Sequence, residues 1–259
     1  MFLSFSRKRL LPFLVYALVF SCQSPAKVQK VETQAYKLTP GEVSMVDSVM
    51  IKKIQPYKDS VDADMNQVLV KSLVAMEKGQ PESKLGNWVS DVCLYLANEM
   101  YHPADKHPAD FAFFNTGGLR SSIPKGPVTK GNVFELMPFE NELIILTLHG
   151  ATVKKIFNFI ASKGGVPVSG LRMGIQNNTP VNIYINEMPF DSARTYKVLT
   201  SDYLANGGDQ CFFLEDAIAR DTVGLKIRDG LIRFMTEKGK RNETLDSELD
   251  RRIILTHAK

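Results

Sequence analysis

The chain has 259 residues, of which 44% are hydrophobic and 23% charged, and a formal net charge of +4. Residues 1–21 hold three basic residues and no acidic one, so the rest of the chain carries a formal charge of only +1. This weak charge, with no stripe of Lys and Arg interleaved with aromatic residues, excludes a polynucleotide-binding protein, and the length is ample for one packed domain.

The N-terminal segment has the features of a bacterial lipoprotein signal peptide. Three basic residues, Arg7 to Arg9, precede the apolar residues 10–20, and Ser21 comes directly before Cys22. The apolar run is shorter than the ~20 residues that span a bilayer, which argues against a transmembrane anchor. We therefore expect residues 1–21 to be removed and Cys22 to be lipidated. This predicts an exported, membrane-anchored lipoprotein on the periplasmic face or the cell surface of a bacterium.

Residues 22–42 are polar and without periodicity, which predicts a flexible tether, and residues 43–259 are expected to form the domain. Pro56 is expected to kink or break the first helical segment of that domain. The apolar residues 68–70 and 73–75 predict strands. The first segment is predicted to form one or two helices because its apolar residues recur at helical spacing: Val43, Val46, Met50, Ile54, Tyr57 and Val61.

Residues 84–101 predict an amphipathic helix, whose apolar stripe includes Trp88 and Cys93. Trp88 is therefore expected in the core. Cys93 and Cys211 could form a disulfide in an exported protein, but the position of Cys93 on an apolar face favours two buried thiols. Residues 102–110 contain two His and two Asp, yet two His-Pro steps favour an extended, solvated loop over a metal site.

The second half of the chain mixes predicted strands and helices irregularly. Strands are predicted over residues 111–114, 171–176, 181–185 and 196–200. One helix is expected after Gly150. A closing helix is expected through Val223, Ile227, Leu231 and Phe234, stopped by Gly239. This order predicts an α+β fold with a mixed β-sheet flanked by helices.

The strand over residues 111–114 is followed directly by a motif of polar residues and glycines: Asn115, Gly117, Gly118 and Arg120. The glycines let the backbone approach a ligand closely, and an amide beside a guanidinium suits sugar hydroxyls or phosphate oxygens. A Gly pair after a strand is more often a plain turn, so this motif alone does not decide between a turn and a binding site.

Two later motifs favour the binding site. Phe139 follows Pro138 between a predicted short helix and a strand, and Tyr203 and Asp209 lie in the run Tyr-Leu-Ala-Asn-Gly-Gly-Asp after the strand over residues 196–200. This ordered set, with Leu85-Gly86-Asn87 and Asp91 upstream, resembles the C-terminal, substrate-binding domain of the 5′-nucleotidase and UDP-sugar hydrolase family. The resemblance covers roughly residues 45–255.

The resemblance implies a role for each motif residue. Phe139 and Tyr203 would stack on the two faces of a base, and Asp209 would accept hydrogen bonds from the ribose hydroxyls. Asn115 and Arg120 would hold the nucleoside and the near phosphate. The sequence departs from the family at two places: Tyr203 stands where phenylalanine is common, and residues 78–82, Lys-Gly-Gln-Pro-Glu, lack the arginine that precedes Leu-Gly-Asn in the family. Lys78 or Lys84 would supply a charge there without the geometry of a guanidinium.

In the family, hydrolysis belongs to a separate N-terminal metallophosphoesterase domain with two metals. The four histidines here are scattered, and neither a catalytic residue nor a metal site is expected. The resemblance therefore implies the nucleotide-recognising part of a split 5′-nucleotidase, active in nucleotide catabolism with a metallophosphoesterase partner that holds two divalent metals. Two alternatives stay open: a nucleoside- or nucleotide-binding lipoprotein without a catalytic role, and a metal-independent hydrolase.

Overall fold

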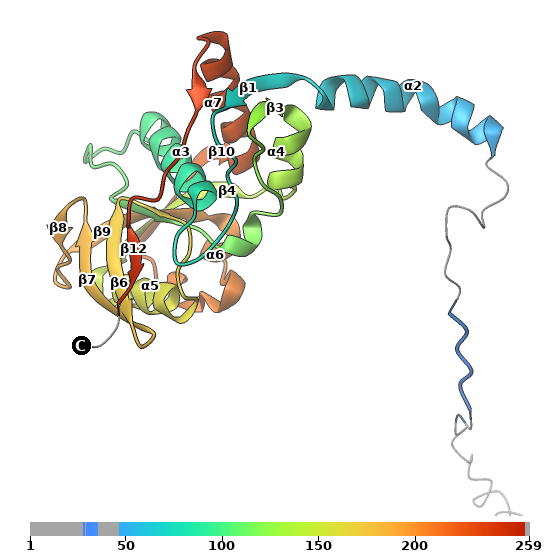
Figure 1. The fold of residues 1–259 in the computed structure, drawn as a ribbon. Helices are drawn as coiled ribbons and strands as arrows, with labels where there is room; N and C mark the ends of the chain where they lie inside the picture. The colour runs from blue at the N-terminus through green and yellow to red at the C-terminus, as the bar shows by residue number, and fades with distance from the viewer. Residues whose placement is uncertain (1–27, 29, 36–46, 257–259) are drawn as a thin grey trace, which may run out of the picture. The chain divides into compact units, whose positions relative to one another are not determined.

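The computed structural model describes residue 28, residues 30–35 and residues 47–256 (Figure 1). The chain divides between Ile51 and Lys52 into two units. The predicted signal peptide, Cys22 and most of the predicted tether lie outside the described residues, so they stay predictions. Among the described residues, no helix combines the length and the hydrophobicity that a membrane-spanning segment needs.

A five-stranded mixed sheet forms the centre of the second unit. The neighbouring strands β9 (Thr195–Ser201) and β2 (Phe111–Phe113) run parallel, whereas all other neighbours in this sheet are antiparallel. In spatial order the strands are β10 (Ala219–Lys226), β4 (Glu142–His149), β9 (Thr195–Ser201), β2 (Phe111–Phe113) and β5 (Val168–Ser169).

Both faces of the sheet are buried at the inner strands β4 and β2, which explains why these two strands are nearly continuous apolar runs. Alternate residues enter two hydrophobic cores: Phe111 and Phe113 lie in one, and Ala112 and Phe114 in the other. Helices α3 (Lys84–Met100) and α7 (Ile227–Lys240) cover one face, and α5 (Gly150–Ser162) covers the other (Figure 1). The predicted α+β fold is confirmed.

Two smaller sheets complete the second unit. Their strands are β11 (Thr244–Leu245), β1 (Val68–Ser72) and β3 (Gly126–Thr129) in one sheet, and β12 (Ile253–Leu255), β6 (Leu171–Gln176), β7 (Thr179–Ile185) and β8 (Met188–Pro189) in the other. The short elements are helices α4 (Lys130–Leu136) and α6 (Asp202–Ala205) and the 3-10 turns η2 (Thr116–Gly118), η3 (Gly208–Gln210) and η4 (Phe212–Leu214).

The predicted helices and strands before residue 102 are mostly confirmed. Helix α2 (Ser48–Met65) continues through Pro56 instead of breaking there. Trp88 is 6% exposed, as expected for a core residue. The predicted strand over residues 73–75 is wrong. The chain turns out of the sheet after β1, where the Ser72 hydroxyl donates a hydrogen bond to the Val74 carbonyl at 2.7 Å.

The predicted closing helix is wrong at both ends. Val223 belongs to strand β10, and α7 begins only at Ile227. Gly239 does not stop the helix, which continues to Lys240. The glycine is instead a packing position, because a Cβ there would lie 1.9 Å from the Leu69 carbonyl oxygen of β1. Val223 falls at the helical spacing of the apolar residues in α7, so the sequence pattern did not show that a strand precedes this helix.

The predictions for the cysteines and for residues 102–110 can be compared directly with the structure. Cys93 and Cys211 are buried free thiols, and burial raises the pKa of both, that of Cys211 to about 11. Residues 102–110 form a loop without regular secondary structure. Its end is less solvated than expected, because Asp110 is 7% exposed and accepts a hydrogen bond from the Lys197 backbone.

Candidate functional site

The three sequence motifs converge at one edge of the five-stranded sheet. Strands β2 and β9 are parallel, so the segments after Phe113 and after Ser201 leave the sheet at the same edge. Strand β4 is antiparallel to β9, with Leu143 opposite Ser201, so the segment that precedes β4 enters there as well. Carboxyl ends of strands beside a change in strand direction are common places for ligand sites.

One cavity of about 310 Å³ lies at this edge. Its lining includes all seven binding residues predicted from the sequence, together with Asn141, which had no predicted role although it closes the Pro-Phe-Glu-Asn run. The lining residues are Asn115, Gly117, Gly118, Arg120, Phe139, Asn141, Tyr203 and Asp209. The structure thus brings the predicted residues together, and their binding of a ligand remains a prediction.

The two aromatic residues of the cavity are not part of the core. Phe139 is 47% exposed and Tyr203 is 42% exposed. Their segments are joined by Asp202, whose Oδ1 accepts hydrogen bonds from the backbone N–H of Tyr203 at 2.8 Å and of Glu142 at 3.2 Å. Two half-exposed rings on adjoining segments provide flat apolar surface for a planar ligand.

The Asn-x-Gly-Gly segment forms the 3-10 turn η2, and the Gly118 N–H donates to the Asn115 carbonyl at 3.2 Å. A Cβ on Gly118 would lie 3.1 Å from Asn115 Oδ1, so glycine leaves room for the amide. Arg120 is exposed, and its backbone N–H donates to the Leu136 carbonyl at 2.8 Å. Among the described residues, the guanidinium makes a single weak hydrogen bond, from Nη1 to the Gly117 carbonyl at 3.5 Å, and can therefore bind an anion.

A buried arginine from α7 holds the segment that carries Phe139. The Arg228 side chain donates from Nη1 to the carbonyls of Pro138 at 3.1 Å and Met137 at 3.5 Å, and from Nη2 to Glu140 Oε1 at 2.8 Å. Its guanidinium also lies 4.5 Å from the centre of the Phe134 ring. Sequence patterns could not reveal this contact, because the partners are about ninety residues apart.

Arg228→Ala is expected to lower the free energy of unfolding by about 1–2 kcal/mol, because two backbone carbonyls lose a charged donor. The matched control is Lys226→Ala. Lys226 contacts the same carboxylate, Glu140, at 2.5 Å, but its side chain is 39% exposed, so its loss should leave stability nearly unchanged. Urea denaturation of both variants measures the difference. Equal losses would show that Arg228 acts only through the surface ion pair.

Residues 78–82, which lack the family's arginine, are not part of the cavity lining. Lys78 Nζ donates to the Leu119 carbonyl at 3.3 Å, next to Arg120. The Glu82 carboxylate accepts hydrogen bonds from the backbone N–H groups of Arg251 and Arg252 at 2.9 and 3.0 Å. Lys78 therefore places a positive charge near Arg120, whereas Glu82 is used to hold the C-terminal segment.

A two-metal phosphoesterase centre needs several convergent His, Asp or Asn ligands. Among the described residues, no group of three or more His, Cys, Asp or Glu side chains could hold a metal ion. The polar side chains of the 102–110 loop pair instead: His107 Nε2 lies 3.1 Å from Asp110 Oδ1, and Lys197 Nζ lies 2.6 Å from Asp105 Oδ1. The His and Asp side chains of this loop therefore do not fit the ligand set of a two-metal centre.

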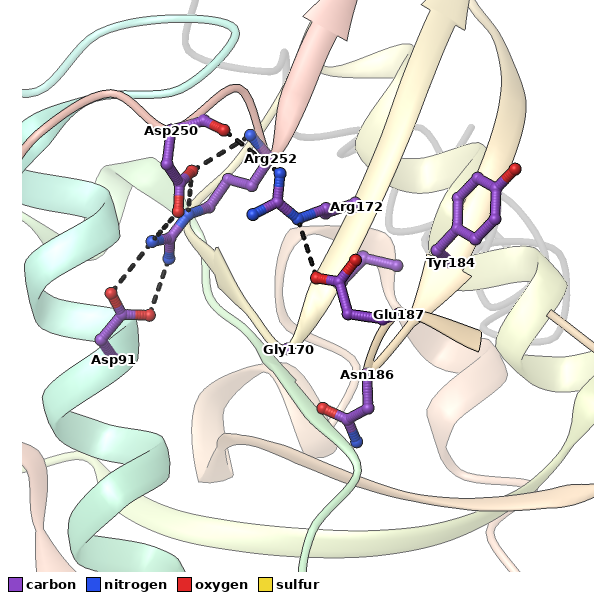
Figure 2. Close-up of a pocket in the computed structure, with 9 residues that line it drawn as sticks. Asp91, Gly170, Arg172, Tyr184, Asn186, Glu187, Asp250 and Arg252 are labelled. Atoms are coloured by element: carbon purple, nitrogen blue, oxygen red, sulfur yellow. Dashed lines mark hydrogen bonds and ion pairs between the residues drawn. The ribbon is translucent and has the colours of Figure 1, made fainter. Parts of the chain in front are cut away.

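A second cavity, of about 380 Å³, lies between α3, β6 and the segment before β12 (Figure 2). Figure 2 shows Arg252 between Asp91 and Asp250, and Arg172 beside Glu187. Its charged groups are paired with one another, so this cavity is best explained by ion pairs that hold the C-terminal segment. Asp91, one of the residues that carry the family resemblance, is thus explained by its ion pair with Arg252.

Comparisons with known proteins agree with the fold. The family model described as 5′-nucleotidase, C-terminal domain, matches residues 64–216. Protein UshA of Yersinia enterocolitica is 26% identical over 188 residues, which cover 71% of this chain and 33% of UshA. The chain thus spans about a third of the length of this curated relative.

Two solved structures share the fold. The 5′-nucleotidase precursor from Thermus thermophilus aligns with a TM-score of 0.69 and 27% identity, over 81% of this chain and 43% of that one. The NAD nucleotidase of Haemophilus influenzae aligns with a TM-score of 0.60 and 18% identity, over 82% of this chain and 42% of that one. With a family model that matches more than half of its residues, the chain belongs to the 5′-nucleotidase C-terminal domain family.

Proposed function

We propose that the cavity at the sheet edge binds the nucleoside part of a nucleotide, and that the chain is the recognition part of a split 5′-nucleotidase-type hydrolase. The observation that carries this proposal is the composition of one cavity. Two half-exposed aromatic rings, a carboxylate, an exposed guanidinium and two amides, contributed by three separate segments, line the same space.

Each lining group matches one part of a nucleotide. Phe139 and Tyr203 offer ring faces to the base, and stacking contributes about 1–3 kcal/mol per base. The Asp209 carboxylate has only acceptors and suits the donors of the sugar hydroxyls. Arg120 suits a phosphate oxygen, and the amides of Asn115 and Asn141 suit the polar edge of the base or the sugar.

Hydrolysis of the phosphate ester is assigned to a separately encoded metallophosphoesterase that holds two divalent metals. The family membership supports this assignment, because the matched family model describes the C-terminal domain of 5′-nucleotidase. The proposed setting is an exported lipoprotein anchored through lipidated Cys22, which would keep both proteins at the same membrane.

The purified mature chain is expected to bind adenosine and AMP in a calorimetric titration. It should not hydrolyse AMP in the presence of Mn²⁺, Co²⁺ or Zn²⁺, because it would contribute binding groups without a metal centre. Adding the metallophosphoesterase should restore turnover. Hydrolysis by the chain alone would favour the metal-independent hydrolase, and absence of nucleoside binding would overturn the proposal.

A second candidate function is a nucleoside- or nucleotide-binding lipoprotein without a catalytic partner. The stretch over residues 78–82 favours it, because a lysine stands where a bidentate anion contact is expected in the family. The two functions differ in their use of the phosphate. Equal affinities for adenosine and AMP, with no metallophosphoesterase in a neighbouring reading frame, would favour the binding protein.

A further inference from the structure

We infer that the Tyr203 hydroxyl is a positioning group: it orients the Asp209 carboxylate and so makes recognition of the sugar depend on the same side chain that stacks on the base. This inference rests on the proposed function, because it assumes that the cavity binds a nucleoside. It concerns a residue at which this chain differs from the phenylalanine that the family resemblance implies.

The phenol forms two hydrogen bonds with a single residue. Its Oη donates to Asp209 Oδ1 at 2.8 Å and accepts the backbone N–H of Asp209 at 3.2 Å. Asp209 has φ 52° and ψ 26°, a left-handed conformation that few residues other than glycine adopt without local support. The two bonds give that support, since they tie both the carboxylate and the backbone of Asp209 to one ring.

The turn around Asp209 is also packed against the Tyr203 ring. A Cβ on Gly208 would lie 2.6 Å from two atoms of that ring and 2.5 Å from the Tyr203 carbonyl oxygen. The preceding Gly207 has φ 83°, which lets the chain fold back over the ring. The ring and the carboxylate are therefore held in one rigid unit, and moving one would move the other.

This arrangement leaves one carboxylate oxygen for a ligand. Oδ1 is used by Tyr203, and the described residues offer no hydrogen bond to Oδ2. Since Asp209 lines the cavity, Oδ2 is the acceptor offered to a sugar hydroxyl. Phenylalanine at position 203 would keep the ring face but lose both hydrogen bonds. The carboxylate would then rotate freely and would have to be ordered at each binding event.

The test compares two ligands that differ only in the sugar hydroxyls, adenosine and 2′,3′-dideoxyadenosine, by calorimetric titration of the mature chain. Tyr203→Phe is expected to weaken adenosine binding by about threefold to tenfold, the usual effect of a lost hydrogen bond. Binding of 2′,3′-dideoxyadenosine should be unchanged, because the stacking ring remains. Tyr184→Phe is the matched control, since Tyr184 is also 42% exposed but lies on β7, outside this cavity.

A double-mutant cycle isolates the coupling between the two residues. If Tyr203 acts through Asp209, adding Tyr203→Phe to Asp209→Ala should not weaken adenosine binding further. An equal loss for both ligands, or tighter adenosine binding by Tyr203→Phe, would overturn the positioning role. Failure of the unaltered chain to bind either ligand would instead overturn the proposed function, so the two failures are distinguishable. Circular dichroism and thermal melting confirm that each variant is folded.

Discussion

Replacing Arg252 with alanine is expected to lower the free energy of unfolding by about 2–4 kcal/mol. The Arg252 side chain is 11% exposed and joins Asp91 of α3 to Asp250 before β12 (Figure 2). Its Nη1 donates to Asp91 at 2.7 Å and to the Val168 carbonyl at 2.8 Å. Breaking a fully buried pair costs about 3–5 kcal/mol, and the half-exposed Asp91 places this cluster somewhat lower.

Arg233→Ala is the matched control for this prediction. Arg233 also bridges two carboxylates, those of Glu99 and Glu237, but its side chain is 40% exposed. Solvent screens such pairs, so the free energy of unfolding should change little. Urea denaturation of the two variants measures both values. If Arg252→Ala is as stable as Arg233→Ala, the cluster in Figure 2 does not hold the C-terminal segment.

The same cluster gives stability a pH dependence of known sign. Hydrogen bonds from Arg252 hold the pKa of Asp250 below its usual value of 3.8. A carboxylate with a lowered pKa in the folded state stabilises the protein above its unfolded pKa, and this contribution is lost as the pH falls below about 4. The unaltered chain should therefore lose stability more steeply in this range than Arg252→Ala does, as measured by urea denaturation at a series of pH values.

The sequence predicted the cavity well because its residues lie in short segments at the ends of strands. Asn115 follows β2, and Tyr203 follows β9, so the end of each apolar run already placed a motif at a sheet edge. The parallel pairing of β2 with β9 is part of the tertiary structure, and the spacing of apolar residues in the sequence cannot predict it. The order of the motifs, matched to a family, supplied the missing information.

Contacts between distant segments could not be predicted in this way. Arg228 contacts a turn about ninety residues away, and a buried arginine in a helix looks like any solvated charge in sequence. The hydrogen bond from Tyr203 to Asp209 lies within one motif but depends on the left-handed backbone at Asp209. Strand β10 was missed for a different reason. Its exposed face carries polar residues, and Val223 falls at the helical spacing of the apolar residues in the helix that follows.

The largest expected effects on ligand binding come from alanine substitution of the two aromatic residues of the cavity, Phe139 and Tyr203. In the proposed function two rings stack on a base, so Phe139→Ala should cost about 1–3 kcal/mol, which is roughly a fivefold to hundredfold loss of affinity for adenosine. Tyr203→Ala should lose at least as much, because it also removes the hydroxyl that holds Asp209. Calorimetric titration with adenosine measures both variants, and Tyr184→Ala removes a ring of equal exposure from outside the cavity as the control.

The pattern of losses across ligands separates stacking from other roles of these residues. Phe139→Ala should weaken adenosine and 2′-deoxyadenosine equally, because the base is the same in both. Asp209→Ala should weaken adenosine more than the deoxy ligand, since its partner hydroxyl is absent from the latter. Phosphate should add little affinity if the arginine that is missing before Leu85 is its main contact in the family. Unchanged binding by both alanine variants of the aromatic residues would contradict the stacking role, and their exposure would then need another explanation.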